Sequence, residues 1–126
     1  MNGTRPGFHT ITPYIMVKDA TGLVAFVQQV FGATETFRAQ GEAGGIHIEM
    51  QIGNSMLMIG GAVRGPQMPA ALYVYVDDVD GAYQRALVAG ATSLMDAADQ
   101  DDGDRRVGVQ DRFGNQWFIA THHAPK

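Results

Sequence analysis

The chain is 126 residues long, has no cysteine, and carries 13 acidic against 9 basic side chains, for a formal net charge of −4. This length fits one domain, and the lack of cysteine excludes disulfides and thiolate metal ligands. Because no lysine or arginine cluster is present, we expect neither nucleic acid nor a membrane as a partner. No apolar run approaches the ~20 residues of a membrane span, and residues 1–7 lack a signal peptide's apolar core. We therefore expect a cytoplasmic protein with room for a neutral or cationic small ligand.

The first half of the chain is predicted to form a strand, a helix and three further strands. A loose arm is expected at residues 1–8, where Gly and Pro disfavour a helix. A strand at 10–17 is followed by a helix from the candidate N-cap Asp19 to Phe31, where Gly32 ends it. The buried helix face is predicted from the spacing of Leu23, Phe26, Val27 and Val30. The later strands are expected at 34–40, 46–52 and 55–59, with a loop at 41–45 and a turn at Gly53-Asn54.

The second half is predicted to repeat that order after a Gly- and Pro-rich linker at about residues 61–69. A strand at 71–76 precedes a helix that is capped by Asp78 or Asp80 and continues to Ala89, with Gly90 ending it. A strand at 91–95 and an acidic loop at 97–104 follow. The chain then closes with a hairpin at 107–123, whose turn at 111–115 contains Gly114-Asn115. The two modules span about residues 10–60 and 70–121.

Three matches in the same order indicate an internal repeat, which decides the fold. The Gly-Asn turns are offset by 114 − 53 = 61 residues, and the strands that begin at Tyr14 and Tyr73 by 73 − 14 = 59. The Gly-Ala-Thr segments are offset by 90 − 32 = 58. We therefore predict an α+β fold of two βαβββ modules, which form a cup-shaped curved sheet with the helices outside.

The alternation of side chains along the strands predicts which residues line the cup. Aliphatic residues such as Ile15 and Val74 fall on the helix side, and the opposite side forms an aromatic surface with a few polar groups, typical of a small-molecule site. Met16 is expected there as core filling or ligand contact. The predicted ligand-binding residues are Tyr14, His47, Glu49, Tyr73, Tyr75, Gln116 and Phe118.

His47 and Glu49 leave several possibilities open, because they lie two apart on one strand face. They could be a structural hydrogen bond, a polar ligand contact, a base with its orienting group, or two ligands of an unusual metal site. The tyrosines could stack on a planar or cationic ligand or fill the core.

Other conspicuous residues have simpler interpretations. Trp117 alternates onto the helix side and is expected in the core. Asp104, Arg105 and Arg106 are expected to form a salt-bridged loop rim or to anchor an anionic group. His9, His122 and His123 are expected to be solvated.

Five stretches resemble the vicinal-oxygen-chelate superfamily, which includes glyoxalase I, extradiol dioxygenases and bleomycin-binding proteins. They are ITPYIMVKD, VFGATETF, IHIEMQIGNSMLMI, LYVYVDDVD and GDRRVGVQDRFGNQWFIATHH, and they are most similar to its PhnB-like branch. Paired βαβββ modules are the fold of that superfamily. The chain departs from the branch pattern at Val27, Arg106, Arg112 and Asn115, and fold alone does not fix function.

The resemblance also implies where metal ligands would lie. In this chain the corresponding positions are Thr12, Leu57 (or Met58), Ala71 and Phe118. None of these side chains is a suitable ligand for a divalent ion, so we expect no metal and no cofactor.

The favoured hypothesis is a small-molecule binding protein that sequesters an aromatic or cationic compound in a tyrosine-lined cup, as bleomycin-binding proteins do. The alternative is a glyoxalase-like metal-dependent lyase, isomerase or dioxygenase with displaced ligands such as His47 and Glu49. A cup that closes on its own tyrosines and binds nothing tightly is a third possibility. The resemblance further implies a homodimer.

Overall fold

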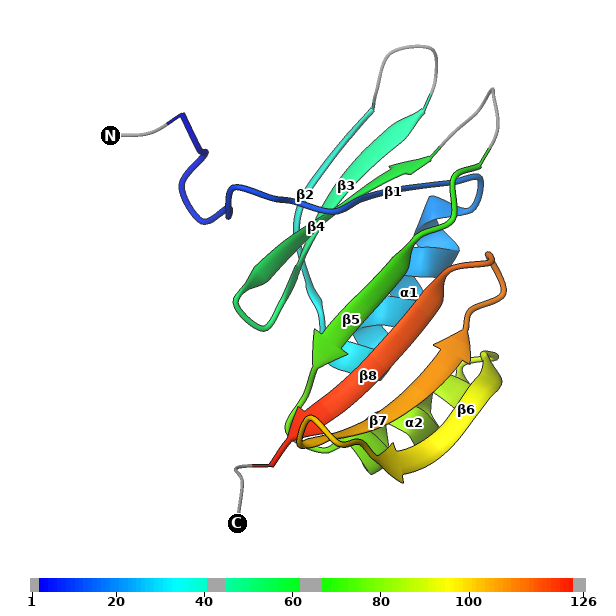
Figure 1. Ribbon diagram of the computed structural model, residues 1–126. Helices are drawn as coiled ribbons and strands as arrows, with labels where there is room; N and C mark the ends of the chain where they lie inside the picture. The colour runs from blue at the N-terminus through cyan, green and yellow to red at the C-terminus, as the bar shows by residue number, and fades with distance from the viewer. Residues whose placement is uncertain (1–2, 41–44, 62–66, 124–126) are drawn as a thin grey trace. The chain divides into compact units, whose positions relative to one another are not determined.

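The computed structural model describes residues 3–40, 45–61 and 67–123. The elements follow the order strand, helix and three strands, twice over (Figure 1). The predicted α+β fold of two βαβββ modules is therefore confirmed. The first set is β1 (Tyr14–Val17), α1 (Ala20–Phe31), β2 (Thr34–Gln40), β3 (Ile46–Ile52) and β4 (Ser55–Gly61). The second set is β5 (Ala71–Tyr75), α2 (Val79–Val88), β6 (Thr92–Asp99), β7 (Asp104–Gln110) and β8 (Gln116–His122).

Each set forms a four-stranded sheet of the same topology. The strand orders are β1-β4-β3-β2 and β5-β8-β7-β6. In each sheet the first and last strands of the set pair in parallel and the other neighbours are antiparallel. The chain divides into two compact units, with residues 1–28 and 32–68 in unit 1 and residues 29–31 and 69–126 in unit 2. The last turn of α1 thus belongs to unit 2.

The helix caps agree with the sequence patterns. The side chain of Asp19 accepts a hydrogen bond from Gly22 N, and Gly32 ends α1 in the left-handed conformation. Asp78, rather than Asp80, caps α2 by accepting from Gly81 N. None of the described helices is long and apolar enough to cross a membrane.

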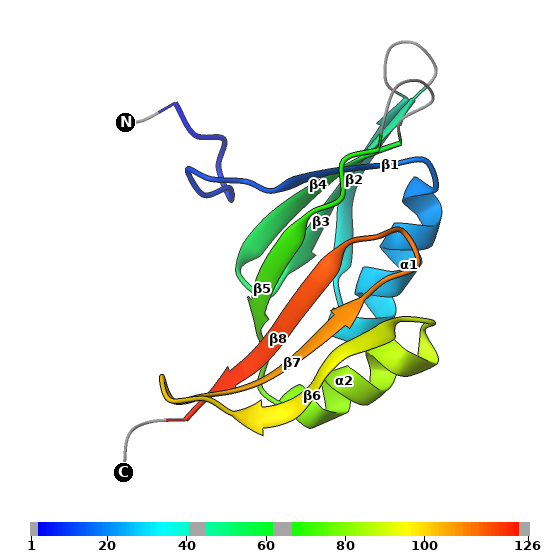
Figure 2. The same cartoon turned by 45° about the vertical axis from the view of Figure 1, so that its right-hand side comes forward.

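The core of each unit lies on the aliphatic side of its sheet. In unit 1 the fully buried strand residues are Ile15, Val17, Ile48, Met50 and Ile59. In unit 2, α2 packs against β6, β7 and β8 and lies behind them in Figure 2. Trp117 is fully buried in this core, as predicted, and its ring centroid lies 5.3 Å from that of Phe31.

Several parts of the chain differ from the sequence-based expectation. The first strand, predicted at 10–17, begins only at Tyr14. The acidic loop predicted at 97–104 is shortened to residues 100–103, because β6 continues to Asp99, where it pairs with Arg105, and β7 begins at Asp104. The arm is not loose throughout, since residues 5–8 form a tight turn in which Phe8 N donates to Arg5 O at 3.0 Å. Residues 41–44 of the predicted loop and 62–66 of the predicted linker lie outside the described residues.

The β7–β8 hairpin is organised by the buried carboxylate of Asp111. Its Oδ1 accepts from the backbone N–H groups of Phe113 and Asn115, both at 2.9 Å. Its Oδ2 accepts from Asn115 Nδ2 at 3.0 Å and Trp117 Nε1 at 2.9 Å. Gly114 takes the positive φ of 94° that the turn requires. The side chain of Asn115 also reaches the segment just before β5, because its Oδ1 accepts from Ala70 N at 2.9 Å.

We expect Asp111→Asn to destabilise the protein by about 2–4 kcal/mol, because an amide N–H₂ would face buried donors in place of a carboxylate oxygen. The free energy of unfolding from urea titration measures this loss. Asp101→Asn is the matched control, since Asp101 is exposed in a turn. Equal stability of the two variants would contradict the role assigned to Asp111.

Candidate functional site

In unit 1 the strand face opposite the buried core carries polar and aromatic side chains. We call the surface formed by Tyr14, Phe37, His47 and Glu49 tyrosine face 1. Tyr14, Glu49 and Phe37 lie in one row across the sheet, because Tyr14 and Glu49 both pair with Met58 and Glu49 pairs with Phe37. Tyr14 and Phe37 are 50% and 49% exposed, whereas Glu49 is 4% exposed. The face therefore presents aromatic rings around a buried carboxylate.

A chain of polar contacts connects the side chains of tyrosine face 1. His47 Nε2 lies 2.9 Å from Glu49 Oε2, and Tyr14 Oη lies 3.3 Å from His47 Nδ1. An ionised carboxylate has no proton to donate, so Nε2–H is the donor to Glu49. In the neutral imidazole the Tyr14 hydroxyl then donates to Nδ1.

Glu49 is also bound by the arm. Arg5 Nη2 lies 2.6 Å from Glu49 Oε1. Burial raises the pKa of Glu49, but the hydrogen bonds from Arg5 and His47 outweigh this effect and hold the pKa below its usual value. Glu49 is therefore an ionised carboxylate whose two oxygens have different partners, one from the sheet and one from the arm.

Tyr14 depends on a glycine in the neighbouring strand. A Cβ atom at Gly60 would lie 2.8 Å from both Cε1 and Oη of Tyr14. The ring can therefore lie across β4 only because residue 60 has no side chain.

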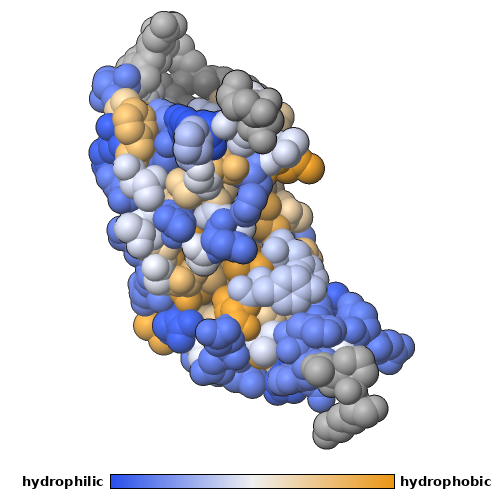
Figure 3. All heavy atoms as spheres, turned by 90° about the vertical axis from the view of Figure 1, so that its left-hand side faces the viewer, coloured by the Kyte–Doolittle hydropathy of each residue, from blue (hydrophilic) through white to orange (hydrophobic). Residues whose placement is uncertain are grey.

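Unit 2 has an equivalent surface, which we call tyrosine face 2 and which is formed by Tyr73, Tyr75, Asp104, Arg106 and Phe118. Phe118 pairs with both Tyr73 and Gly108, so it lies in one row with the first tyrosine. The ring centroids of Tyr73 and Tyr75 are 5.3 Å apart, and these residues are 41% and 62% exposed. In Figure 3, apolar (orange) and weakly polar (pale) side chains reach the surface between strongly hydrophilic (blue) ones.

Asp104 fixes this arrangement of rings. Its Oδ2 accepts from the Tyr73 hydroxyl at 2.6 Å and from the Tyr75 hydroxyl at 2.9 Å. Its Oδ1 lies 2.8 Å from His122 Nδ1. The expectation that Asp104 is a loop-rim residue is therefore wrong, because it begins strand β7 and is 3% exposed. The side chain of His122 is half-exposed but bound to Asp104, so it is not simply solvated.

The pKa values follow from these hydrogen bonds. The bonds from Tyr73 and His122 lower the pKa of Asp104, against the opposing effect of burial. Burial and the bond to Asp104 raise the pKa of Tyr73, and the same carboxylate raises the pKa of Tyr75. The group therefore holds one carboxylate ionised and two phenols neutral at pH 7.

Arg106 occupies in unit 2 the place that His47 has in unit 1. The offset is 106 − 47 = 59, which matches the offset of the paired tyrosines. Its guanidinium carbon lies 5.8 Å from the Tyr73 ring centroid, and its Nη2 donates to Gln100 Oε1 at 3.2 Å. Among the described residues, its Nε is a buried donor without a partner. Arg105, by contrast, pairs with Asp80 and Asp99, as the rim interpretation predicted.

All seven residues predicted to bind a ligand lie on strands, and their role stays a prediction. Tyr14, His47 and Glu49 are brought together in unit 1, and Tyr73, Tyr75 and Phe118 in unit 2. Gln116 lies at the start of β8, paired with Ala71 and Gln110. The sequence-based reasoning missed the contributions of Asp104, His122 and Arg5. The repeat offset, applied to His47, would have found Arg106.

The positions at which the family resemblance implies metal ligands do not fit a metal ion. The Thr12 hydroxyl donates to His9 O, Leu57 is buried, and Met58, Ala71 and Phe118 provide no oxygen or nitrogen donor. Among the described residues, no group of three His, Asp or Glu side chains could hold a metal ion. The expectation of no cofactor stays a prediction.

Comparison with known proteins identifies the family. The model of the Glyoxalase/Bleomycin resistance protein/Dioxygenase superfamily matches residues 7–119. The chain belongs to this superfamily. An uncharacterized protein of Mycobacterium tuberculosis (strain ATCC 25618 / H37Rv) is 34% identical over 124 residues, covering 86% of this chain and 72% of the relative.

Solved structures share the fold. TioX from Micromonospora sp. ML1 superposes with a TM-score of 0.73 at 24% identity, covering 91% of this chain and 99% of that one. A PhnB protein from Bacillus cereus gives 0.70 at 15% identity, covering 90% and 99%. The resemblance to the superfamily is thus confirmed, and a PhnB protein shares the fold, while the activity is not fixed by these similarities.

Acid should destabilise the protein partly through Asp104. Its folded-state pKa lies below the unfolded value of about 3.9, so its contribution is complete above that pH and is lost as the pH falls through the folded pKa. We expect Asp104→Asn to lower stability at pH 7 but to flatten the further loss below about pH 4. Urea unfolding at both pH values measures this difference. Asp101→Asn should keep the wild-type pH dependence, and an unchanged dependence in Asp104→Asn would contradict the assignment.

Proposed function

We propose that the chain is a small-molecule binding protein that holds an aromatic or cationic compound against its tyrosine faces. The observation that carries this proposal is the anchoring of Tyr73 and Tyr75 by one buried carboxylate. Both hydroxyls are engaged, so the rings are held in place while both residues stay exposed. Ring surfaces fixed before binding lose little entropy when a planar ligand stacks on them.

The electrostatics support a cationic rather than an anionic ligand. The net charge is −4, and both tyrosine faces contain an ionised carboxylate. Aromatic rings attract cations through their quadrupole.

Titration with proflavine, a planar cationic dye, tests the proposal by fluorescence. We expect Tyr73→Leu and Tyr75→Leu each to weaken binding about tenfold, since one stacking contact is worth about 1–1.5 kcal/mol. Tyr83→Leu is the matched control, because Tyr83 lies on α2 and its hydroxyl contacts Ser93 and Asp96. Equal affinity in all three variants, or no binding by the wild type, would refute the proposal.

A second candidate function is metal-dependent catalysis of the glyoxalase or dioxygenase type with displaced ligands. The contact between His47 and buried Glu49 at 2.9 Å favours it, because such a pair can act as a base with its orienting group. Metal analysis of protein purified without a tag, with thermal shift in Ni²⁺, Zn²⁺, Mn²⁺ and Fe²⁺, separates the two functions. Stoichiometric metal that is lost in His47→Ala would favour the enzyme over the binding protein.

We also propose a homodimer in the cytoplasm. Among the described residues each sheet ends at β1 and β2 or at β5 and β6, with one isolated bridge from Met68 to Met16 beyond β1, and open strand edges favour association. Sedimentation velocity should give twice the chain mass of 13.6 kDa. A monomer at about 100 μM would overturn this proposal.

A further inference from the structure

Glu49 is contacted by a segment that precedes the first strand. The arm lies beside the sheet of unit 1 in both ribbon views (Figures 1 and 2). Arg5 Nη2 reaches the Glu49 carboxylate from this arm. The Arg5 side chain is 54% exposed and that of Glu49 is 6% exposed. The buried Glu49 carboxylate is thus paired with an exposed arginine that lies outside the sheet.

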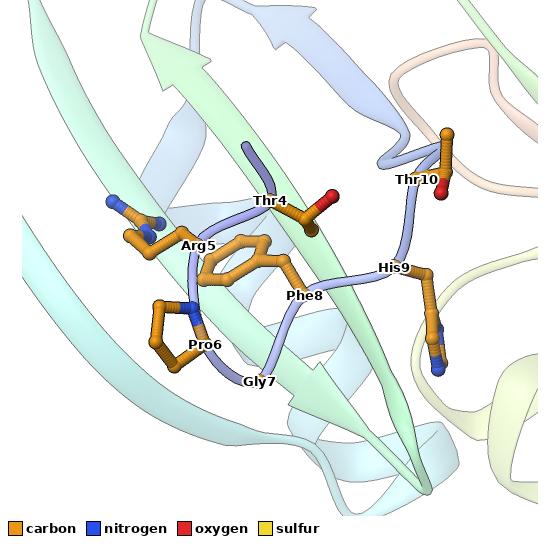
Figure 4. A pocket seen from close by; sticks show the side chains of 7 residues that line it. All are labelled: Thr4, Arg5, Pro6, Gly7, Phe8, His9 and Thr10. Atoms are coloured by element: carbon orange, nitrogen blue, oxygen red, sulfur yellow. The ribbon is translucent and has the colours of Figure 1, made fainter. Parts of the chain in front are cut away.

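The arm is shaped to present this cation together with an aromatic ring. Pro6 and Gly7 occupy the centre of a turn, with Gly7 at φ 86°, and Phe8 N donates to Arg5 O at 3.0 Å. Proline followed by a glycine of positive φ is the pattern of a type II turn. The turn brings the guanidinium carbon of Arg5 to 4.0 Å from the centroid of the Phe8 ring. Figure 4 shows these two side chains against each other, around a hollow lined by residues 4–10.

The surroundings of Glu49 are those of a site for an organic cation. Its Oε2 is held by His47, which belongs to the same strand, so this contact is part of the sheet. Its Oε1 is held by Arg5 from the arm and is therefore the oxygen whose partner can exchange. Phe37 pairs with Glu49 on the neighbouring strand β2, and Tyr14 lies in the same row on β1, beyond β4; both are about half exposed. A planar cation at Oε1 would meet a buried charge and aromatic walls together.

We infer that Glu49, His47, Tyr14 and Phe37 form a recognition site for a guanidinium or amidinium ligand, and that Arg5 of the arm occupies this site until the ligand displaces it. The inference rests on the proposed function and deepens it by naming the cationic group and the oxygen that binds it. The arm acts as a competitor built into the chain. The apparent affinity for the ligand is then the intrinsic affinity multiplied by the fraction of molecules in which the arm is undocked.

Calorimetric titration with benzamidine tests the inference, because this ligand joins a planar amidinium to an aromatic ring as Arg5 and Phe8 do together. We expect Arg5→Ala to bind benzamidine about tenfold more tightly than the wild type, if the arm is docked in about nine of ten molecules. Arg5→Lys should bind it with an intermediate affinity. The gain should vanish in Arg5→Ala combined with Glu49→Gln.

Arg38→Ala is the matched control. It removes one exposed positive charge from unit 1, where Arg38 pairs with Glu35 rather than Glu49. It should leave the affinity unchanged, which excludes a general effect of net charge. In the wild type, saturating benzamidine should also shift the NMR resonance of Arg5 Nε–H to the position of a free arginine. Urea unfolding of each variant establishes that it is folded.

The outcomes separate this inference from the proposed function. Unchanged affinity in Arg5→Ala, or a gain that persists without Glu49, would overturn the arm as competitor. If proflavine still depends on Tyr73 and Tyr75 in that case, the proposed function stands alone. If benzamidine displaces the arm but proflavine affinity does not depend on Tyr73 and Tyr75, the site in unit 1 is supported and ligand binding at tyrosine face 2 is refuted. If neither probe binds, both are refuted.

Discussion

The carboxylate of Asp111 is the constraint on which unit 2 depends. It accepts four hydrogen bonds, which close the β7–β8 turn and fix the indole of Trp117 in the core. Through Asn115 it also positions the residue before β5. Because β5 pairs with β8, this one group determines where Tyr73 and Tyr75 lie relative to Phe118. The turn at Gly53 in unit 1 has a simpler set of side-chain contacts, from Gln51 and between Asn54 and Ser55.

The two units stabilise a buried carboxylate in different ways. Each places a carboxylate under aromatic rings on the face opposite the core, where an unpaired charge would be costly. Asp104 is satisfied within unit 2 by two phenols and His122, so its partners are side chains on strands. Glu49 has one partner on its own strand and one on the arm. Because of this difference, Glu49 of tyrosine face 1 is the carboxylate that we propose exchanges a protein partner for a ligand.

Family membership constrains the fold of this chain more than its chemistry. The superfamily model covers most of the residues, yet the positions where the resemblance implies metal ligands include Leu57, Ala71 and Phe118. Side chains of this kind suit packing and stacking rather than coordination of a divalent ion. The buried carboxylates of the two tyrosine faces, Glu49 and Asp104, lie elsewhere on the strands and are bound by protein side chains. Binding of an organic cation is the function that these residues support best.

The sequence by itself determined the modules, the helix caps and the two faces of each strand, because these depend on local periodicity and on short-range capping. Asp19, Gly32, Ile15 and Trp117 all lie where their local pattern predicted. Only the tertiary structure decided the partners of Asp104, Glu49 and His122, because those contacts join strands and an arm that are far apart in the chain. An acidic residue before a strand looks the same in sequence whether it is solvated or anchors two tyrosines. Its pairing depends on the register of β7 and β5 against β8, which the turn at Asp111 helps to set, rather than on its neighbours in sequence.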